Sequence, residues 1–180
     1  MSFVCKKKKE SQQKVTQEIP FESFITIAPS AAHEMKKWPI EYWKDFLSKY
    51  TDEKIVILGG PADHFCEELE KIDSSRIKNL AGKLSLIESC YTIVKSKLLL
   101  SADTGLLHVA DSLGIKGIVL IGPSAFGYPG NEQIKTLETD LACKPCSKDG
   151  SGGCVQEVYQ KCMKDITVDQ VITSVRHSIN

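Results

Sequence analysis

The sequence predicts an α/β domain with a Rossmann-like parallel sheet that is covered by helices on both faces. Two observations predict this fold class. Short apolar runs, typical of buried strands, alternate along the chain with amphipathic segments that are typical of helices. Glycine, proline or serine ends most of the apolar runs, as expected where a strand turns into a helix. A length of 180 residues favours one domain with a substantial core.

The apolar runs that predict strands are residues 24–29, 54–60, 77–80, 98–101 and 115–122. The segments that predict helices are residues 39–50, 62–72, 85–95, 104–114 and the stretch from 167 onward. Pro39 suits the first turn of its helix. Ser85 with Glu88, and Thr167 with Gln170, have the spacing of capping boxes, which begin helices.

The overall composition excludes some classes of function. The chain carries 23 basic and 23 acidic residues, so its net charge of zero provides no basic field for nucleic acid. No run approaches the ~18 consecutive apolar residues of a membrane-spanning helix, and the expected compartment is the cytoplasm. Residues 1–22 are rich in lysine without a strong period, so we expect a linker or tail before a domain of residues 23–180.

Residues 103–108, with the sequence Asp-Thr-Gly-Leu-Leu-His, join a predicted buried strand to a predicted helix. A helix N-terminus presents unpaired backbone N–H groups and the positive end of the helix dipole, which suits phosphate. Gly105 permits close approach of a ligand, Thr104 adds a hydroxyl, and His108 lies one turn further on. Asp103 as a plain helix cap and His108 as a buried structural histidine are the alternatives.

The turns after the other strands are expected at the same edge of the sheet, because the carboxyl ends of parallel strands meet there. The first turn has Ser30 among small residues, followed by Lys36 and Lys37, one of which could reach a diphosphate. The turn after the second strand has two glycines and Asp63, whose carboxylate could accept hydrogen bonds from a ribose or base. Solvated lysines and a helix-capping Asp63 are the alternatives.

Two common nucleotide-binding patterns are missing from the sequence. The first strand is not followed by G-x-G-x-x-G, and no G-x-x-x-x-G-K-[ST] occurs. NAD-dependent oxidoreductases and P-loop NTPases are therefore poor fits. The aromatic residues Trp38, Tyr42, Trp43 and Phe46 have helical spacing, which predicts a place in the core.

Four cysteines lie close together in a stretch that is rich in Gly, Ser and Lys. They have the spacing C-x2-C-x7-C-x7-C and are Cys143, Cys146, Cys154 and Cys162. Four thiolates could form a tetrahedral structural zinc site. Free or packed thiols and disulfides are the alternatives, and the sequence leaves all three open.

Five motifs in collinear order resemble those of the ADP-heptose:lipopolysaccharide heptosyltransferases, glycosyltransferase family 9. They lie in residues 29–39, 59–63, 80–86, 103–108 and the cysteine segment 143–163. The resemblance covers about residues 24–176. Ser30 and Ala32 depart from it, since they stand where the family has Gly and Ser or Thr. One phosphate-binding hydroxyl is therefore expected to be missing or relocated.

The resemblance implies a GT-B fold, in which two Rossmann-like domains face a cleft, and this chain matches the C-terminal, nucleotide-sugar-binding domain. It implies that Lys36 contacts the donor diphosphate and that Thr104 and Gly105 bind phosphate. Asp103 and His108 would order the turn or approach the sugar phosphate. Asp63 would face the nucleoside, and the backbone of Leu84 would border the adenine.

The implied activity is inverting transfer of heptose, or a related sugar, from an ADP-sugar to a lipopolysaccharide core acceptor, without a required cofactor. The family's general base is an Asp of the N-terminal acceptor domain, which has no counterpart in these residues, so no catalytic residue is visible. The implied location is cytoplasmic, with peripheral attachment at the inner membrane face. The alternatives are a non-catalytic nucleotide-binding module or truncated relative, and a nucleotide-sugar epimerase-like GT-B protein.

Overall fold

The computed structural model describes residues 3–179, with side chains from residue 9 onward. The strands are β1 (Ile25–Ala28), β2 (Ile55–Ile57), β3 (Ile77–Asn79), β4 (Leu99–Ala102), β5 (Gly117–Ile121) and β6 (Ile134–Glu138). The helices are α1 (Phe3–Glu18), the 3-10 helix η1 (Glu34–Lys36), α2 (Ile40–Lys49), α3 (Cys66–Glu70), α4 (Leu86–Lys95), α5 (Gly105–Ser112), α6 (Lys161–Lys164) and α7 (Val168–Ile179).

The strands form one parallel sheet, which confirms the predicted fold class. Its order is β3-β2-β1-β4-β5-β6, and every neighbouring pair is parallel. The chain therefore winds outward from β1 in one direction and from β4 in the other, so a topological switch point lies between these two strands. Ligands of open α/β sheets bind outside the carboxyl ends of the strands at such a point.

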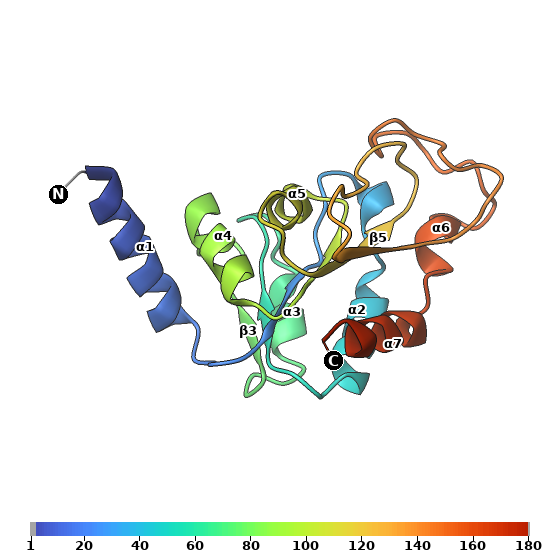
Figure 1. Cartoon of the computed structure of the whole chain (residues 1–180). Helices are drawn as coiled ribbons and strands as arrows, with labels where there is room; N and C mark the ends of the chain where they lie inside the picture. The colour runs from blue at the N-terminus through green and yellow to red at the C-terminus, as the bar shows by residue number, and fades with distance from the viewer. Residues whose placement is uncertain (1–2, 180) are drawn as a thin grey trace.

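Helices cover both faces of the sheet (Figure 1). Alternate residues of β1 point to opposite faces, so Ile25 and Ile27 pack with α2, α3 and α7, whereas Ala28 packs with α1, α4 and α5. Trp43 and Phe46 on α2 are fully buried in the first of these clusters. The predicted core position of the aromatic residues is thereby confirmed, although Tyr42 is only partly buried.

The N-terminal segment differs from the expectation of an irregular tail. Phe3–Glu18 forms α1, which packs against α4 and stands at one end of the molecule (Figure 1). Val15 and Ile19 are buried, and the Lys14 ammonium lies 3.1 Å from the Glu88 carboxylate. These two buried apolar side chains lie one helical turn apart in a lysine-rich segment. Their hydrophobic periodicity is too weak to predict the helix from the sequence. A domain boundary at residue 22 stays a prediction.

Three other elements differ from the expected ones. The edge strand β6 and the short helix α6 were not expected, and α3 is shorter than the predicted helix of residues 62–72. Both capping boxes are confirmed, since Ser85 with Glu88 and Thr167 with Gln170 exchange backbone and side-chain hydrogen bonds. Within residues 3–179, no helix combines the length and apolar character that crossing a membrane requires.

Candidate functional site

An open cleft of about 360 Å³ lies at the carboxyl edge of the sheet, at the switch point between β1 and β4. The turns after β1 and β2 form one side, and the N-terminal ends of α4 and α5 form the other. Five of the predicted site residues line this cleft, namely Ser30, Asp63, Leu84, Thr104 and Gly105. The parallel topology brings these residues together from positions far apart in the sequence.

Thr104 forms the N-terminal cap of α5. Its backbone is extended and its hydroxyl accepts a hydrogen bond from the Leu106 N–H at 3.2 Å. Thr104, not Asp103, is therefore the capping residue, and the alternative that Asp103 is a plain cap is wrong. The Leu107 N–H donates to the Thr104 carbonyl at 3.1 Å. The N–H of Gly105, the first helical residue, is left for water or a ligand, because the first N–H groups of a helix have no intrahelical partner.

Gly105 faces open space in the cleft. A Cβ atom built at this position would meet no protein atom within 4 Å. Packing within the chain therefore does not require glycine here, and glycine costs helix stability relative to alanine. Because glycine has no side chain, a ligand has room to approach the backbone at the N-terminus of α5, the positive end of the helix dipole.

Asp63 braces the turn after β2. Its carboxylate accepts hydrogen bonds from the Gly60 N–H at 2.6 Å and from the Ser30 hydroxyl. Phe65, not Asp63, is the cap of α3, so the helix-cap alternative is wrong. Ser30 is one of the two residues that depart from the family pattern, and its hydroxyl group already donates its hydrogen bond to Asp63. Gly59 allows this arrangement, because a Cβ there would lie 2.8 Å from an Asp63 carboxylate oxygen.

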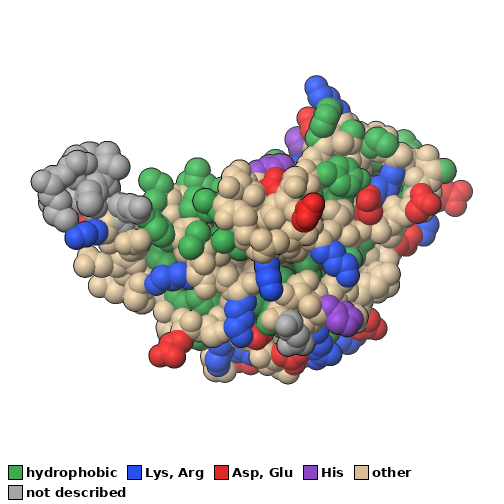
Figure 2. Space-filling view, viewed as in Figure 1, with side chains coloured by type: hydrophobic (Ala, Val, Ile, Leu, Met, Phe, Trp, Pro, Cys, Tyr) green, Lys and Arg blue, Asp and Glu red, His purple; other side chains and the backbone are tan. Residues whose placement is uncertain are grey.

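An apolar wall completes the cleft. Leu84, Leu86 and Leu106 line it, and Leu86 is 65% exposed although it is a large apolar side chain. Figure 2 shows apolar side chains gathered over α4, on the side of the molecule that carries the cleft wall. Leu86 and Leu106 were not among the predicted site residues, since a leucine in a helix ordinarily indicates core packing.

Lys36, Asp103 and His108 lie beside the cleft and do not line it. The Lys36 ammonium lies 3.0 Å from one Asp103 carboxylate oxygen, and both side chains are largely buried. Ser124, in the loop after β5, donates a hydrogen bond to the same oxygen at 2.9 Å. His108 is half exposed with its Nε2 atom 3.9 Å from the other oxygen, so the alternative of a buried histidine is wrong.

The structure distinguishes Lys36 from Lys37. Lys37 pairs with Glu34 at the surface, 2.8 Å away. Within the described part of the chain, the Lys36 ammonium has one hydrogen-bond acceptor, the Asp103 carboxylate. An ammonium carries three donors, so two N–H groups of Lys36 are available to a ligand.

Two glycines with positive φ hold this ion pair. A Cβ on Gly127 (φ 105°) would clash with the Asp103 carboxyl carbon, and a Cβ on Gly150 (φ 89°) would lie 2.5 Å from the Lys36 Cγ. Neither glycine was identified from the sequence. Both lie in loops whose path to Asp103 and Lys36 cannot be read from local patterns.

The four clustered cysteines lie in one neighbourhood. Burial, and then the thiols of Cys143 and Cys154, raise the pKa of Cys146, and burial and Cys146 raise the pKa of Cys162. All four are free thiols, which contradicts the disulfide alternative. Between residues 9 and 179, whose side chains the structure describes, no three His, Cys, Asp or Glu side chains are placed to hold one metal ion. The zinc site stays a prediction that this arrangement does not support.

Comparison with known proteins assigns the chain to a family. Residues 2–153 match the family model described as glycosyltransferase family 9 (heptosyltransferase). The chain belongs to this family. Family 9 membership agrees with the motifs at the carboxyl edge, four of which contain residues that line the cleft or adjoin it.

The similar proteins are heptosyltransferases. Lipooligosaccharide heptosyltransferase 2 of Campylobacter jejuni subsp. jejuni serotype O:6 is 29% identical over 150 residues, which is 78% of this chain and 46% of that protein. The structure of E. coli ADP-heptose lps heptosyltransferase II matches with a TM-score of 0.76 at 20% identity, covering 95% of this chain and 51% of that one.

A third match, E. coli heptosyltransferase WaaC with ADP-2-deoxy-2-fluoro heptose, has a TM-score of 0.66 at 17% identity and covers 92% of this chain and 47% of that one. These two structures share the Rossmann-like fold of this chain. Both are structures of GT-B heptosyltransferases. The chain spans about half the length of the curated relatives it matches.

Proposed function

We propose that the cleft binds the ADP part of a nucleotide sugar and that the chain is the donor-binding half of a heptosyltransferase. The open space over Gly105 at the N-terminus of α5 carries this proposal. A helix N-terminus with an adjacent hydroxyl suits a phosphate, and the apolar wall beside it suits a base. The E. coli heptosyltransferase WaaC, whose structure shares this fold, was solved with ADP-2-deoxy-2-fluoro heptose, an ADP-sugar analogue.

Each part of ADP has matching chemistry in and beside the cleft. The diphosphate accepts hydrogen bonds from the Gly105 N–H and from two free N–H groups of Lys36, while the Thr104 hydroxyl lies next to it. The adenine packs against Leu84 and Leu106. Asp63 keeps unused lone pairs on its carboxylate and can accept from a ribose hydroxyl.

This arrangement serves departure of ADP during sugar transfer. An acceptor hydroxyl attacks the anomeric carbon of the donor and gives its proton to a general base, the bond from that carbon to the phosphate oxygen breaks, and negative charge accumulates on the diphosphate. The α5 N-terminus and Lys36 stabilise that charge more strongly than the charge of the bound donor, which lowers the barrier.

The proposed acceptor is a sugar of the lipopolysaccharide core, which places the reaction at the cytoplasmic side of the inner membrane. The acceptor domain and the general base would come from the half of the relatives that this chain does not match. A second candidate is a module that binds ADP and transfers nothing by itself. The two candidates share ADP binding and differ in turnover with an ADP-sugar and acceptor.

Replacing Gly105 with alanine tests the proposed donor site. ADP affinity is expected to fall about tenfold, because the added methyl group occupies the space next to the phosphate. Stability is expected to stay equal or to rise by up to about 1 kcal/mol, since alanine favours a helix over glycine. Calorimetric titration with ADP and denaturant unfolding measure the two effects.

Gly130→Ala is the matched control, because a Cβ there also meets open space and Gly130 lies outside the cleft. It is expected to bind ADP like the original chain. Equal ADP affinity in all three proteins, or tighter binding of UDP than of ADP, would contradict the proposal.

A further inference from the structure

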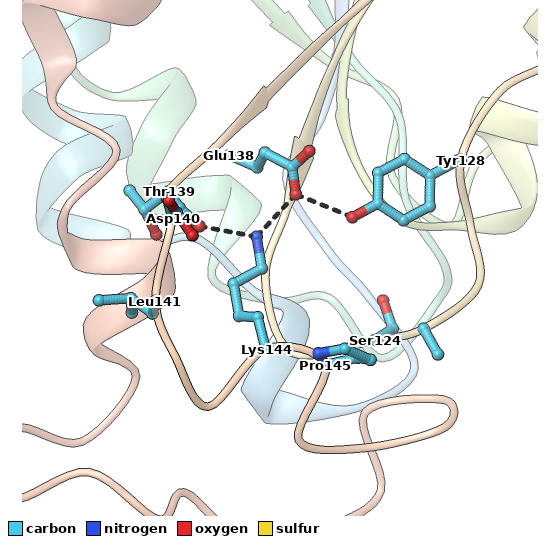
Figure 3. A pocket seen from close by; sticks show the side chains of 9 residues that line it. Ser124, Tyr128, Glu138, Thr139, Asp140, Leu141, Lys144 and Pro145 are labelled. Carbon is cyan, nitrogen blue, oxygen red and sulfur yellow. Dashed lines mark hydrogen bonds and ion pairs between the residues drawn. The ribbon is translucent and has the colours of Figure 1, made fainter.

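A second cavity, of about 490 Å³, opens at the same edge of the sheet beyond the ends of β5 and β6. Figure 3 shows its lining side chains, which come from the loop after β5, from Glu138 at the end of β6 and from the segment that follows β6. Backbone hydrogen bonds hold these two segments together, since Ala125 donates to the Ser147 carbonyl at 3.0 Å and Ser147 to the Pro123 carbonyl at 3.1 Å. The cavity has the size of a small-molecule site.

Lys144 is fully engaged within the wall of this cavity. Its ammonium donates to the Glu138 carboxylate at 2.8 Å, to the Thr139 carbonyl at 3.1 Å and to the Ile121 carbonyl at 3.4 Å (Figure 3). An ammonium has three donors, so none remains for an incoming phosphate. The lysine therefore shapes the cavity and does not attract anions to it.

The cavity instead presents hydrogen-bond acceptors. Tyr128 and Lys144 both donate to the Glu138 Oε2 atom, which leaves Glu138 Oε1 without a donor in the described part of the chain. Asp140 likewise has no donor among the described residues, and it lines the same cavity. Burial opposes ionisation of Glu138, but the hydrogen bonds from Lys144 and Tyr128 hold its pKa below the usual value.

The charge and shape of the lining narrow the choice of ligand. Glu138, Asp140 and Lys144 together carry one net negative charge, which disfavours phosphates and nucleotides. The ammonium beside Glu138 also disfavours a metal cation. Tyr128, which is 48% exposed, and Leu141 add apolar surface. Unpaired carboxylate oxygens beside an aromatic ring suit a neutral ring with several hydroxyl donors.

We infer that this cavity is a subsite for a neutral sugar ring. Ser124 links it to the donor site, because this buried serine lines the cavity and donates to Asp103 beside the cleft. The inference rests on the proposed sugar transfer in one respect only. The transfer defines which molecule supplies the sugar ring, and that molecule is either the acceptor or the donor.

The test is a titration of the full chain with methyl α-D-mannoside, followed by amide NMR shifts. Shifts are expected at Tyr128 and in residues 138–147, and inorganic phosphate is expected to cause none there. Asp140→Asn is expected to weaken mannoside binding about fivefold, as for the loss of one hydrogen bond. Asp140 is exposed and has no hydrogen-bond partner among the side chains described for residues 9–179, so the variant is expected to fold normally.

Glu132→Gln is the matched control, since Glu132 is exposed and lies outside the cavity. If an ADP-sugar displaces the mannoside and ADP does not, the occupant of the cavity is the sugar of the donor. If the mannoside and the ADP-sugar bind at the same time, the occupant is the sugar of the acceptor. No shifts in this cavity, equal shifts with phosphate, or equal affinity of the Asp140→Asn protein would overturn the inference. ADP shifts are read separately at Thr104 and Gly105, so failure of the donor site is distinguishable.

Discussion

A Lys36→Met protein is expected to bind ADP about one to two orders of magnitude more weakly than the original chain. Hydrogen bonds to charged groups contribute about 1.5–3 kcal/mol, and the variant loses the ammonium that we place on the diphosphate. Methionine keeps an unbranched stem, so the packing of Lys36 against Gly150 is retained. Calorimetric titration with ADP measures the effect.

Two controls separate diphosphate contact from a general disturbance of the cleft. Lys37→Met removes the neighbouring lysine, which pairs with Glu34 at the surface, and is expected to leave ADP affinity unchanged. Adenosine lacks the diphosphate and is expected to bind the original and Lys36→Met proteins equally. An equal loss of adenosine and ADP binding would assign Lys36 to the structure of the cleft instead of to the ligand.

Gly127→Ala is expected to destabilise the chain by about 2–4 kcal/mol. Positive φ is costly for a residue with a Cβ atom, and the added methyl group would overlap the Asp103 carboxylate, whose carbon lies 2.3 Å from the Cβ position. Asp103 must then move, which breaks its bonds to Lys36 and Ser124. Denaturant unfolding measures the loss.

Gly130→Ala, in the same loop, has neither a positive φ nor a neighbour within 4 Å of the Cβ position. Its free energy of unfolding is expected to stay within about 0.5 kcal/mol of the original. If Gly127→Ala were as stable as Gly130→Ala, the close packing of this loop on Asp103 would be wrong.

The central strands could be predicted because burial on both faces makes their sequences apolar throughout. All four residues of β1 and all five of β5 are buried. The edge strand β6 contains a lysine, a threonine and a glutamate, and only Ile134 is buried, so the sequence pattern of this strand is too weak to identify it. The same weakness hides α1, whose contact with α4 depends on the tertiary fold.

The residues of the cleft could be predicted in part, because parallel strands bring their carboxyl-end turns to one edge. That rule places Ser30, Asp63 and Thr104 together without knowledge of side-chain directions. It could not choose between Lys36 and Lys37, since the choice depends on how η1 turns the chain. Nor could it identify Ser124, which reaches Asp103 from a loop 21 positions away in the sequence.

The crystal structure of the chain with ADP tests the donor site most directly. The account predicts a phosphate oxygen within hydrogen-bonding distance of the Gly105 N–H and the Lys36 ammonium, with the adenine against Leu84 and Leu106. ADP in the cavity beyond β5 and β6, or a diphosphate remote from the N-terminus of α5, would contradict it.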